Sequence, residues 1–173
     1  MPQSFLAKLP LSRYEIDRDH LGRERENLFD ELWADSATRV LVVHQGSALL
    51  SGPAALALLP VEAVPDAALK VYLGRSLSPT SPEPVGTPIV VVDVQDAGAL
   101  AEGEWGNLRQ LGTNLSDRDA GMLTEALAIL NWHHSHAFSP RTGNATVPEK
   151  GGWVRRDPLS DTEVFPRTDP AVI

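Results

Sequence analysis

Four polar residues in the last third of the chain have the spacing of a metal site without its usual ligands. Ser139 and Thr142 form one pair, Asp157 and Ser160 form another, and two residues separate the members of each pair. Paired Cys-x-x-Cys motifs hold structural zinc, but of these four residues only Asp157 is a zinc ligand, and one carboxylate cannot hold the ion. We therefore expect no structural zinc, and a hydrogen-bonded polar cluster in its place.

Three histidines at the end of a predicted helix offer a second metal chemistry. His133 and His136 share a helix face and could bind an ion through imidazole nitrogens, with His134 beside them. A structural role is favoured, because the helix dipole stabilises histidines near a helix C-terminus. His20 and His44 have no partner visible in the sequence, which favours surface or structural roles.

Two tryptophans flank this region, and two interpretations apply to them. Trp132 and Trp153 could stack on a nucleotide base, because aromatic faces suit adenine and nicotinamide. The favoured interpretation is that they wedge the C-terminal segment against the helix, since a zinc-free segment needs apolar anchors. The candidate anchors are Phe138, Trp153, Val154 and Phe165.

The elements that position these residues follow from apolar periodicity. Residues 17–33 carry leucines at helical spacing after Asp17 or Asp19 as N-cap, which predicts an amphipathic helix. Two β-rich runs, 39–44 and 48–50, predict a hairpin that turns at Gln45-Gly46. Two further runs, 68–77 and 87–95, predict strands separated by a Pro-rich surface loop. A second helix begins at Ser116, with Leu123, Leu127 and Leu130 on one face.

These elements predict an α+β N-terminal domain with a long connecting helix, followed by a small degenerate zinc-ribbon-like β module. The N-terminal domain is assigned to residues 1–115, the connecting helix to 116–137 and the β module to 138–166. The module is predicted from its Pro, Gly and Thr content and its short β-prone pieces.

Composition limits the classes of function. The chain has 173 residues, 42% of them hydrophobic, a net charge of −8 and no cysteine. This charge argues against a broad phosphate-binding surface, although Arg155 and Arg156 form a local basic spot. No apolar run is long enough for a membrane span, and the first residues lack a secretory signal pattern, so we expect a cytoplasmic protein with no membrane contact.

The last third of the chain resembles the middle of the NADH pyrophosphatases, a branch of the Nudix hydrolases. The similar segments are ALAILNWHHSHAFSPRTG, GGWVRRDPLS and FPRTDPAVI, within Leu123 to Ile173. The family pattern has an Asn-Trp-His run, a Phe-Cys-x-x-Cys-Gly knuckle, a Gly-Gly-Trp strand, a second Cys-x-x-Cys and a Phe/Tyr-Pro-Arg-x-x-Pro entry into the catalytic domain. The four family cysteines correspond to Ser139, Thr142, Asp157 and Ser160.

The resemblance implies an enzyme that uses Mg²⁺ or Mn²⁺ to split the pyrophosphate of NAD(H) into AMP and the mononucleotide. It also implies a homodimer and action on NAD-capped RNA ends. Phe165 and Ile173 correspond to residues that line the dinucleotide pocket in the family, and Phe165 could equally be a core residue. Residues 167–173 correspond to the start of the Nudix domain.

The sequence lacks the Nudix signature Gly-x5-Glu-x7-Arg-Glu-x-x-Glu-Glu-x-Gly, whose glutamates hold the catalytic ions. We therefore predict that the chain by itself is inactive, as the N-terminal and ribbon part of an NAD(H) diphosphatase. The alternative is a non-catalytic dimerisation or partner-binding module. No nucleophile elbow, P-loop or dinucleotide-binding glycine fingerprint supports an unrelated enzyme.

Overall fold

The central sheet is built from segments in which apolar residues occupy successive positions. The computed structural model describes residues 15–67 and 69–166. The strands are ordered β1-β6-β7-β2-β3-β4, while β5 pairs with β2 and β8 with β3; only β2 and β7 run parallel. The strands are β1 (Ile16–Asp17), β2 (Arg39–His44), β3 (Ser47–Gly52), β4 (Ala55–Leu56), β5 (Leu58–Pro60), β6 (Leu69–Ser76), β7 (Pro88–Asp93) and β8 (Trp105–Gly106).

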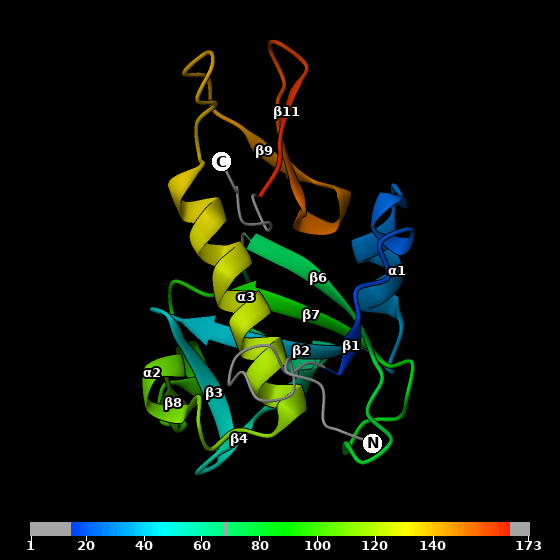
Figure 1. Cartoon of the computed structure of the whole chain (residues 1–173), viewed down its shortest axis with the longest axis vertical. Coiled ribbons are helices and arrows are strands. Elements are labelled where there is room, and N and C mark those ends of the chain that lie inside the picture. Colours follow the sequence, from blue (N-terminus) through cyan, green and yellow to red (C-terminus); the bar gives the residue numbers. More distant parts are fainter. Residues whose placement is uncertain (1–14, 68, 167–173) are drawn as a thin grey trace, which may run out of the picture.

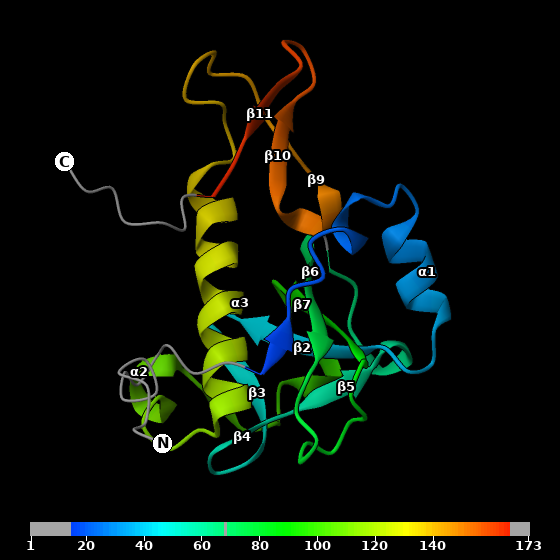
Figure 2. The ribbon, with the colours of Figure 1, turned by 45° about the vertical axis from the view of Figure 1, so that its right-hand side comes forward.

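Both faces of this sheet are covered, which is why its central strands lack a polar alternation. Val40 and Val42 of β2 pack with α1 (Leu28–Ala34), whereas Leu41 and Val43 of the same strand belong to the cluster that includes α3 (Asp117–Ser135). Figure 2 shows the sheet lying between these two helices. The fold is thus mixed α+β, with a curled sheet and a long helix across it (Figure 1).

The predicted hairpin, the two further strands and the second helix are confirmed. Gln45 and Gly46 both have positive φ, 49° and 75°, as a two-residue type I′ turn requires, and Val43 pairs with Ala48 across it. Ser116 caps α3, because its Oγ accepts a 3.1 Å hydrogen bond from the Asp119 amide. α3 is also one wall of the core, with Leu123 and Leu130 fully buried.

The prediction of one helix over residues 17–33 is wrong. A 3-10 helix, η2 (Gly22–Glu24), is followed by extended backbone at Arg25, and α1 begins only at Leu28. Asp19 does not cap an α-helix: it has φ 42°, and its carboxylate accepts hydrogen bonds from Tyr72 and Arg75 of β6 and from the backbone of Gly22 in η2. These long-range bonds override the local helical pattern.

Residues 138–166, called the C-terminal sheet below, follow α3 as a separate three-stranded antiparallel sheet. Its strands are β9 (Val147–Glu149), β10 (Val154–Asp157) and β11 (Thr162–Val164), in the order β11-β10-β9. In Figure 1 it stands beyond the end of α3, above the central sheet. Two further short helices are α2 (Leu108–Leu111) and η5 (Lys150–Gly152). Across the described ranges, no helix has the length and apolar character needed to cross a bilayer.

Candidate functional site

A buried carboxylate, Asp157, is the centre of the polar cluster in the C-terminal sheet. Its Oδ2 accepts hydrogen bonds from Ser160 Oγ at 2.6 Å, Thr142 Oγ1 at 2.7 Å and Asn144 Nδ2 at 3.0 Å. Its Oδ1 accepts from the backbone amides of Leu159 at 2.9 Å and Ser160 at 3.3 Å. The Asp157 side chain is fully buried, so these donors replace the water that would otherwise solvate its charge.

Three of the four predicted positions therefore converge on one point. The hydrogen bonds of Ser160 and Thr142, in that order, hold the pKa of Asp157 well below its usual value of 3.8. The fourth residue, Ser139, is buried beside them, and its Oγ accepts from the amides of Arg141 and Thr142. The sequence analysis did not identify Asn144 as a member of the cluster. An Asn next to a Gly is typical of a turn in which the Asn side chain hydrogen-bonds to groups nearby in the chain.

Two of the four predicted apolar anchors of this sheet are wrong. Phe138 is 64% exposed and Phe165 59% exposed, whereas Val154 is buried and Trp153 is partly buried. The exposure of Phe165 excludes a core role in the part of the chain that is described. The apolar anchors of the C-terminal sheet are therefore Val154 and Trp153, together with Val164, which also packs against the central core.

The Gly151-Gly152-Trp153 segment docks the C-terminal sheet on β6. Trp153 Nε1 donates a 2.7 Å hydrogen bond to the Tyr72 carbonyl of β6. Gly152 approaches β6 so closely that an added Cβ would lie 2.8 Å from Val71 Cγ2 and 3.0 Å from the Lys70 carbonyl oxygen. The expected wedge by Trp153 is therefore present, but against β6. Trp132 belongs to the central core, which supports its structural interpretation.

A second attachment joins α3 to the C-terminal sheet through His133. Arg155 donates from Nη1 to His133 Nδ1 at 2.9 Å, and His133 Nε2 lies 2.7 Å from the Gly152 carbonyl oxygen. Because arginine can only donate, Nδ1 must accept, and the proton of a neutral imidazole is placed on Nε2. Burial lowers the pKa of His133 to about 4, which keeps this imidazole neutral near pH 7.

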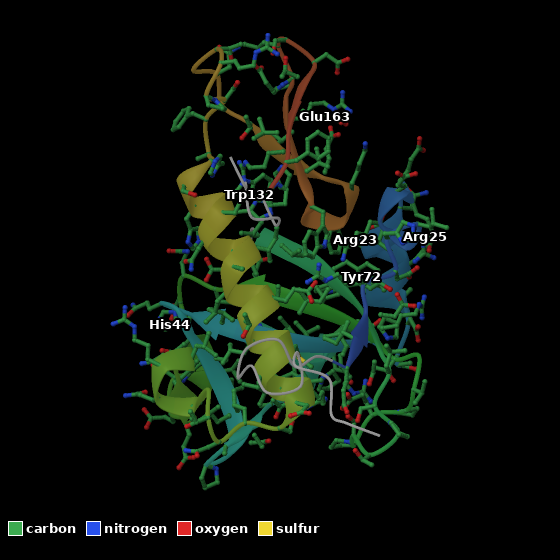
Figure 3. The ribbon with its side chains drawn as sticks, in the orientation of Figure 1. Arg23, Arg25, His44, Tyr72, Trp132 and Glu163 are labelled. Carbon is green, nitrogen blue, oxygen red and sulfur yellow. The ribbon has the colours of Figure 1, made fainter. Side chains whose placement is uncertain are left out.

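Two arginines lie over the Trp153 ring, and both approach a buried carboxylate. The Arg23 guanidinium stacks 3.7 Å from the Trp153 ring centroid, and Arg18 and Arg23 both approach Glu125 of α3. Burial raises the pKa of Glu125, and the two arginines oppose that shift. Burial likewise lowers the pKa of Arg23 to about 10. Figure 3 shows Arg23 and Tyr72 on the same side of the molecule, where η2 approaches β6.

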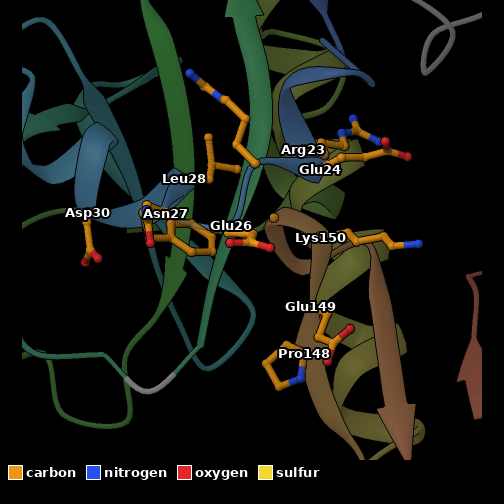
Figure 4. A pocket seen from close by; sticks show the side chains of 12 residues that line it. Arg23, Glu24, Glu26, Asn27, Leu28, Asp30, Pro148, Glu149 and Lys150 are labelled. Carbon is orange, nitrogen blue, oxygen red and sulfur yellow. The ribbon is translucent and has the colours of Figure 1, made fainter. Parts of the chain in front are cut away.

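A pocket of about 500 Å³ lies along this junction, between η2 and α1 on one side and β9 and η5 on the other (Figure 4). Cationic and anionic side chains alternate along its wall, and several of them are paired, as Arg25 is with Glu31 and Lys150 with Glu163. The pocket therefore presents no uniform charge to a ligand. It marks the line along which η2 and α1 meet β9 and η5.

The other predicted residues do not form one site. His134 bonds to Asp93, His136 Nδ1 lies 3.1 Å from the Trp132 carbonyl oxygen, and His44 contacts the Val94 carbonyl oxygen at 2.9 Å. These contacts favour the structural interpretation of the histidines. Among residues 15–67 and 69–166, no group of three or more His, Cys, Asp or Glu side chains could hold a metal ion. Ile173 lies outside the described residues.

The donors around Asp157 do not fit zinc, so the purified chain should contain none. Both oxygens of the only suitable ligand already accept hydrogen bonds, and Ser139, Thr142 and Ser160 offer neutral hydroxyls. We expect elemental analysis to find less than about one zinc per ten chains and EDTA to leave the melting temperature unchanged. One zinc per chain, lost together with stability in EDTA, would contradict this prediction.

Comparison with known proteins decides the family. Residues 37–132, which span most of the central sheet and α3, match the family described as NADH pyrophosphatase-like rudimentary NUDIX domain. The chain belongs to the NADH pyrophosphatase branch of the Nudix hydrolases. The resemblance stated from the C-terminal segments is thus confirmed, and the match adds that the central α+β unit is itself Nudix-like.

Relatives of this family match over most of the chain. The chain is 37% identical over 142 residues to NAD-capped RNA hydrolase NudC of Mycobacterium tuberculosis and of Mycobacterium bovis, which is 82% of this chain and 42% of each relative. It is 36% identical over 67 residues to human NAD-capped RNA hydrolase NUDT12, covering 34% of this chain and 14% of that protein. The chain therefore spans less than half the length of these Nudix relatives.

Proposed function

We propose that this chain is the N-terminal and C-terminal-sheet part of an NAD(H) diphosphatase, which hydrolyses the pyrophosphate of NAD(H) to AMP and nicotinamide mononucleotide. The observation that carries the proposal is the match over 82% of the chain to relatives named NAD-capped RNA hydrolases. NAD-capped RNA is accordingly a second substrate of the proposed enzyme. A homodimer is proposed from the same family resemblance.

Within such an enzyme, the role proposed for this chain is positional. β10 begins directly after the docked Gly151-Gly152-Trp153 segment and pairs with β11, which ends one residue before Phe165. The direction in which the chain leaves β11 is thus fixed by the contact with β6. This geometry supports the proposal that Phe165 is presented, exposed, to a dinucleotide pocket shared with a catalytic domain.

The ions of the reaction would be held outside this chain. Mg²⁺ or Mn²⁺ would polarise the phosphoryl group and lower the pKa of an attacking water. Such a hard ion needs several oxygen ligands converging on one point, and the glutamate signature that provides them in Nudix enzymes is absent from the sequence. The chain's own residues would orient and enclose the site.

The test is AMP release from NADH. We expect the 173-residue chain with Mg²⁺ or Mn²⁺ to release no AMP above a buffer control, whereas a chimera extended by the Nudix part of the M. tuberculosis relative should release it. The intact relative serves as positive control. Metal-dependent turnover by the chain alone, after control for contaminating hydrolases, would refute the proposed division of roles. A folded but inactive chimera would refute the diphosphatase proposal.

One observation favours the alternative, a dimerisation or partner-binding module. The C-terminal sheet exposes four large apolar side chains, Phe138, Val147, Leu159 and Phe165. Exposed apolar residues gathered on a small unit are typical of contact surfaces. Sedimentation of the chain alone distinguishes the two. A tight dimer that Leu159→Ser disrupts would support the module, whereas a monomer would support an enzyme whose dimer interface belongs mainly to its catalytic domain.

A further inference from the structure

A pocket of about 400 Å³ lies at the carboxyl ends of the two parallel strands, β2 and β7, beneath α3. In Figure 1 the arrowheads of these strands point to the same side of the molecule, and Figure 3 places His44 at that edge. Ligands of open α/β sheets bind in crevices outside the carboxyl ends of parallel strands. None of the residues that line this pocket belongs to the Asp157 cluster or to the docking segment.

The wall of this pocket contains a buried carboxylate with a free oxygen. The Asp93 side chain is only 7% exposed, and its Oδ2 accepts a 2.8 Å hydrogen bond from His134 Nε2. Within the described residues its Oδ1 accepts no hydrogen bond. Asp93 lines the pocket, and its Oδ1 is not sealed away from solvent. This oxygen is therefore free to accept a hydrogen bond from a donor in the pocket.

The neighbouring side chains can both donate and accept. A neutral His134 that donates from Nε2 to Asp93 keeps Nδ1 as an acceptor, and the ring is 56% exposed. The side-chain amides of Gln45, Gln95 and Asn131 also line the pocket, and none has a hydrogen-bond partner among the described residues. Each amide offers two N–H donors and one carbonyl acceptor.

The opposite wall is apolar, formed by Val43, Leu127 and Leu130. A second hollow shares Gly46, Leu127 and Asn131 with the pocket and continues towards Leu108 and Arg109. The combined site thus joins an apolar surface to a short row of hydrogen-bonding groups, as small-molecule sites do.

We propose that this pocket binds the vicinal diol of a hydroxyl-rich ring, either a free sugar or the ribose of a nucleoside. Two adjacent hydroxyls each donate and accept, so they match the carboxylate and the amides together. An organic cation would donate only, leaving the amide N–H groups without acceptors. An inorganic phosphate would meet the Asp93 carboxylate. Among the described residues no lysine or arginine lines this pocket, and Arg109 lines only the adjoining hollow. The inference does not depend on the proposed diphosphatase function.

The test is a titration of the 173-residue chain, followed through the side-chain amide signals of Asn131 and Gln95 and the ring signals of His134 by NMR. The probes are adenosine, D-ribose, 2′,3′-dideoxyadenosine, which lacks the diol, and benzamidine as an organic cation. The variants are His134→Ala, at an exposed position, and Asp93→Asn, with folding checked by circular dichroism. His20→Ala, an exposed histidine outside the pocket, is the matched control.

We expect saturable shifts with adenosine, and binding at least about tenfold weaker for dideoxyadenosine and in both pocket variants, because a hydrogen bond to a charged group is lost. The His20 variant should bind as the wild type does. If adenosine binds and D-ribose does not, the ligand is a nucleoside. If both bind comparably, the ligand is a sugar. The proposal fails if neither adenosine nor D-ribose shifts these signals up to about 20 mM, or if His134→Ala leaves binding unchanged. It also fails if the dideoxy analogue binds as well as adenosine does, or if benzamidine binds best.

Discussion

Replacing Gly152 with alanine should release the C-terminal sheet from β6 and lower the free energy of unfolding by about 3 kcal/mol. Two effects add at this position. Gly152 has φ +86°, a conformation that alanine rarely adopts, and the new Cβ would lie 2.8 Å from Val71 Cγ2 and 3.0 Å from the Lys70 carbonyl oxygen. The backbone oxygen is part of β6 and cannot move aside. The hydrogen bonds of Trp153 and His133 nearby would then be broken or lengthened.

Gly143→Ala separates these two effects. Gly143 also has a positive φ, +76°, but an added Cβ there would meet nothing within 4 Å. This variant should lose only about 1 kcal/mol, the cost of the backbone conformation alone. Urea unfolding of both variants, followed by circular dichroism, measures the difference. Equal losses would show that the close approach to β6 contributes nothing, and that the docking interpretation is wrong.

Much of the fold could be predicted because its strongest elements carry local signals. The hairpin has a turn pair that tolerates positive φ, and α3 has a serine cap and a regular apolar face. The short strands β1, β4, β5 and β8 carry no comparable signal, since two or three residues form a strand only where a partner already lies beside them. The helix predicted over residues 17–33 failed for the same reason, because Asp19 is held by Tyr72, 53 residues away.

The polar cluster was predictable in its members but not in its centre or its support. Spacing brought together Ser139, Thr142, Asp157 and Ser160. The structure shows that Asp157 is the acceptor for the hydroxyls of Thr142 and Ser160 and for the amide of Asn144. The pairing of Asp93 with His134 joins residues 41 positions apart, which no local pattern indicates. Sequence spacing thus identifies the members of each short turn, and long-range packing determines which of these residues meet.

Replacing Asp157 with alanine should lower the melting temperature by roughly 5–10 °C, because buried donors would be left without an acceptor. The donors concerned are the hydroxyls of Thr142 and Ser160, the Asn144 amide and the backbone amides of Leu159 and Ser160. Asp157→Asn should lose about half as much, since its carbonyl can still accept. An unchanged melting temperature for Asp157→Ala would show that the cluster does not replace a metal as the support of this sheet.

The pH dependence identifies the charge of Asp157 as the source of this stability. Its pKa is lower in the folded chain than the usual 3.8, so the unfolded chain takes up the proton first as the solution is acidified. The stabilisation by the carboxylate is therefore complete above about pH 5 and is lost as the pH falls through 4 and below. We expect the melting-temperature difference between wild type and Asp157→Asn to shrink over that range. His133, whose pKa is lowered from 6.5 to about 4, weakens both proteins equally between those values, because only the unfolded imidazole is protonated there. Its effect cancels in the comparison, and a difference that stays constant down to about pH 3 would refute the role of the Asp157 charge.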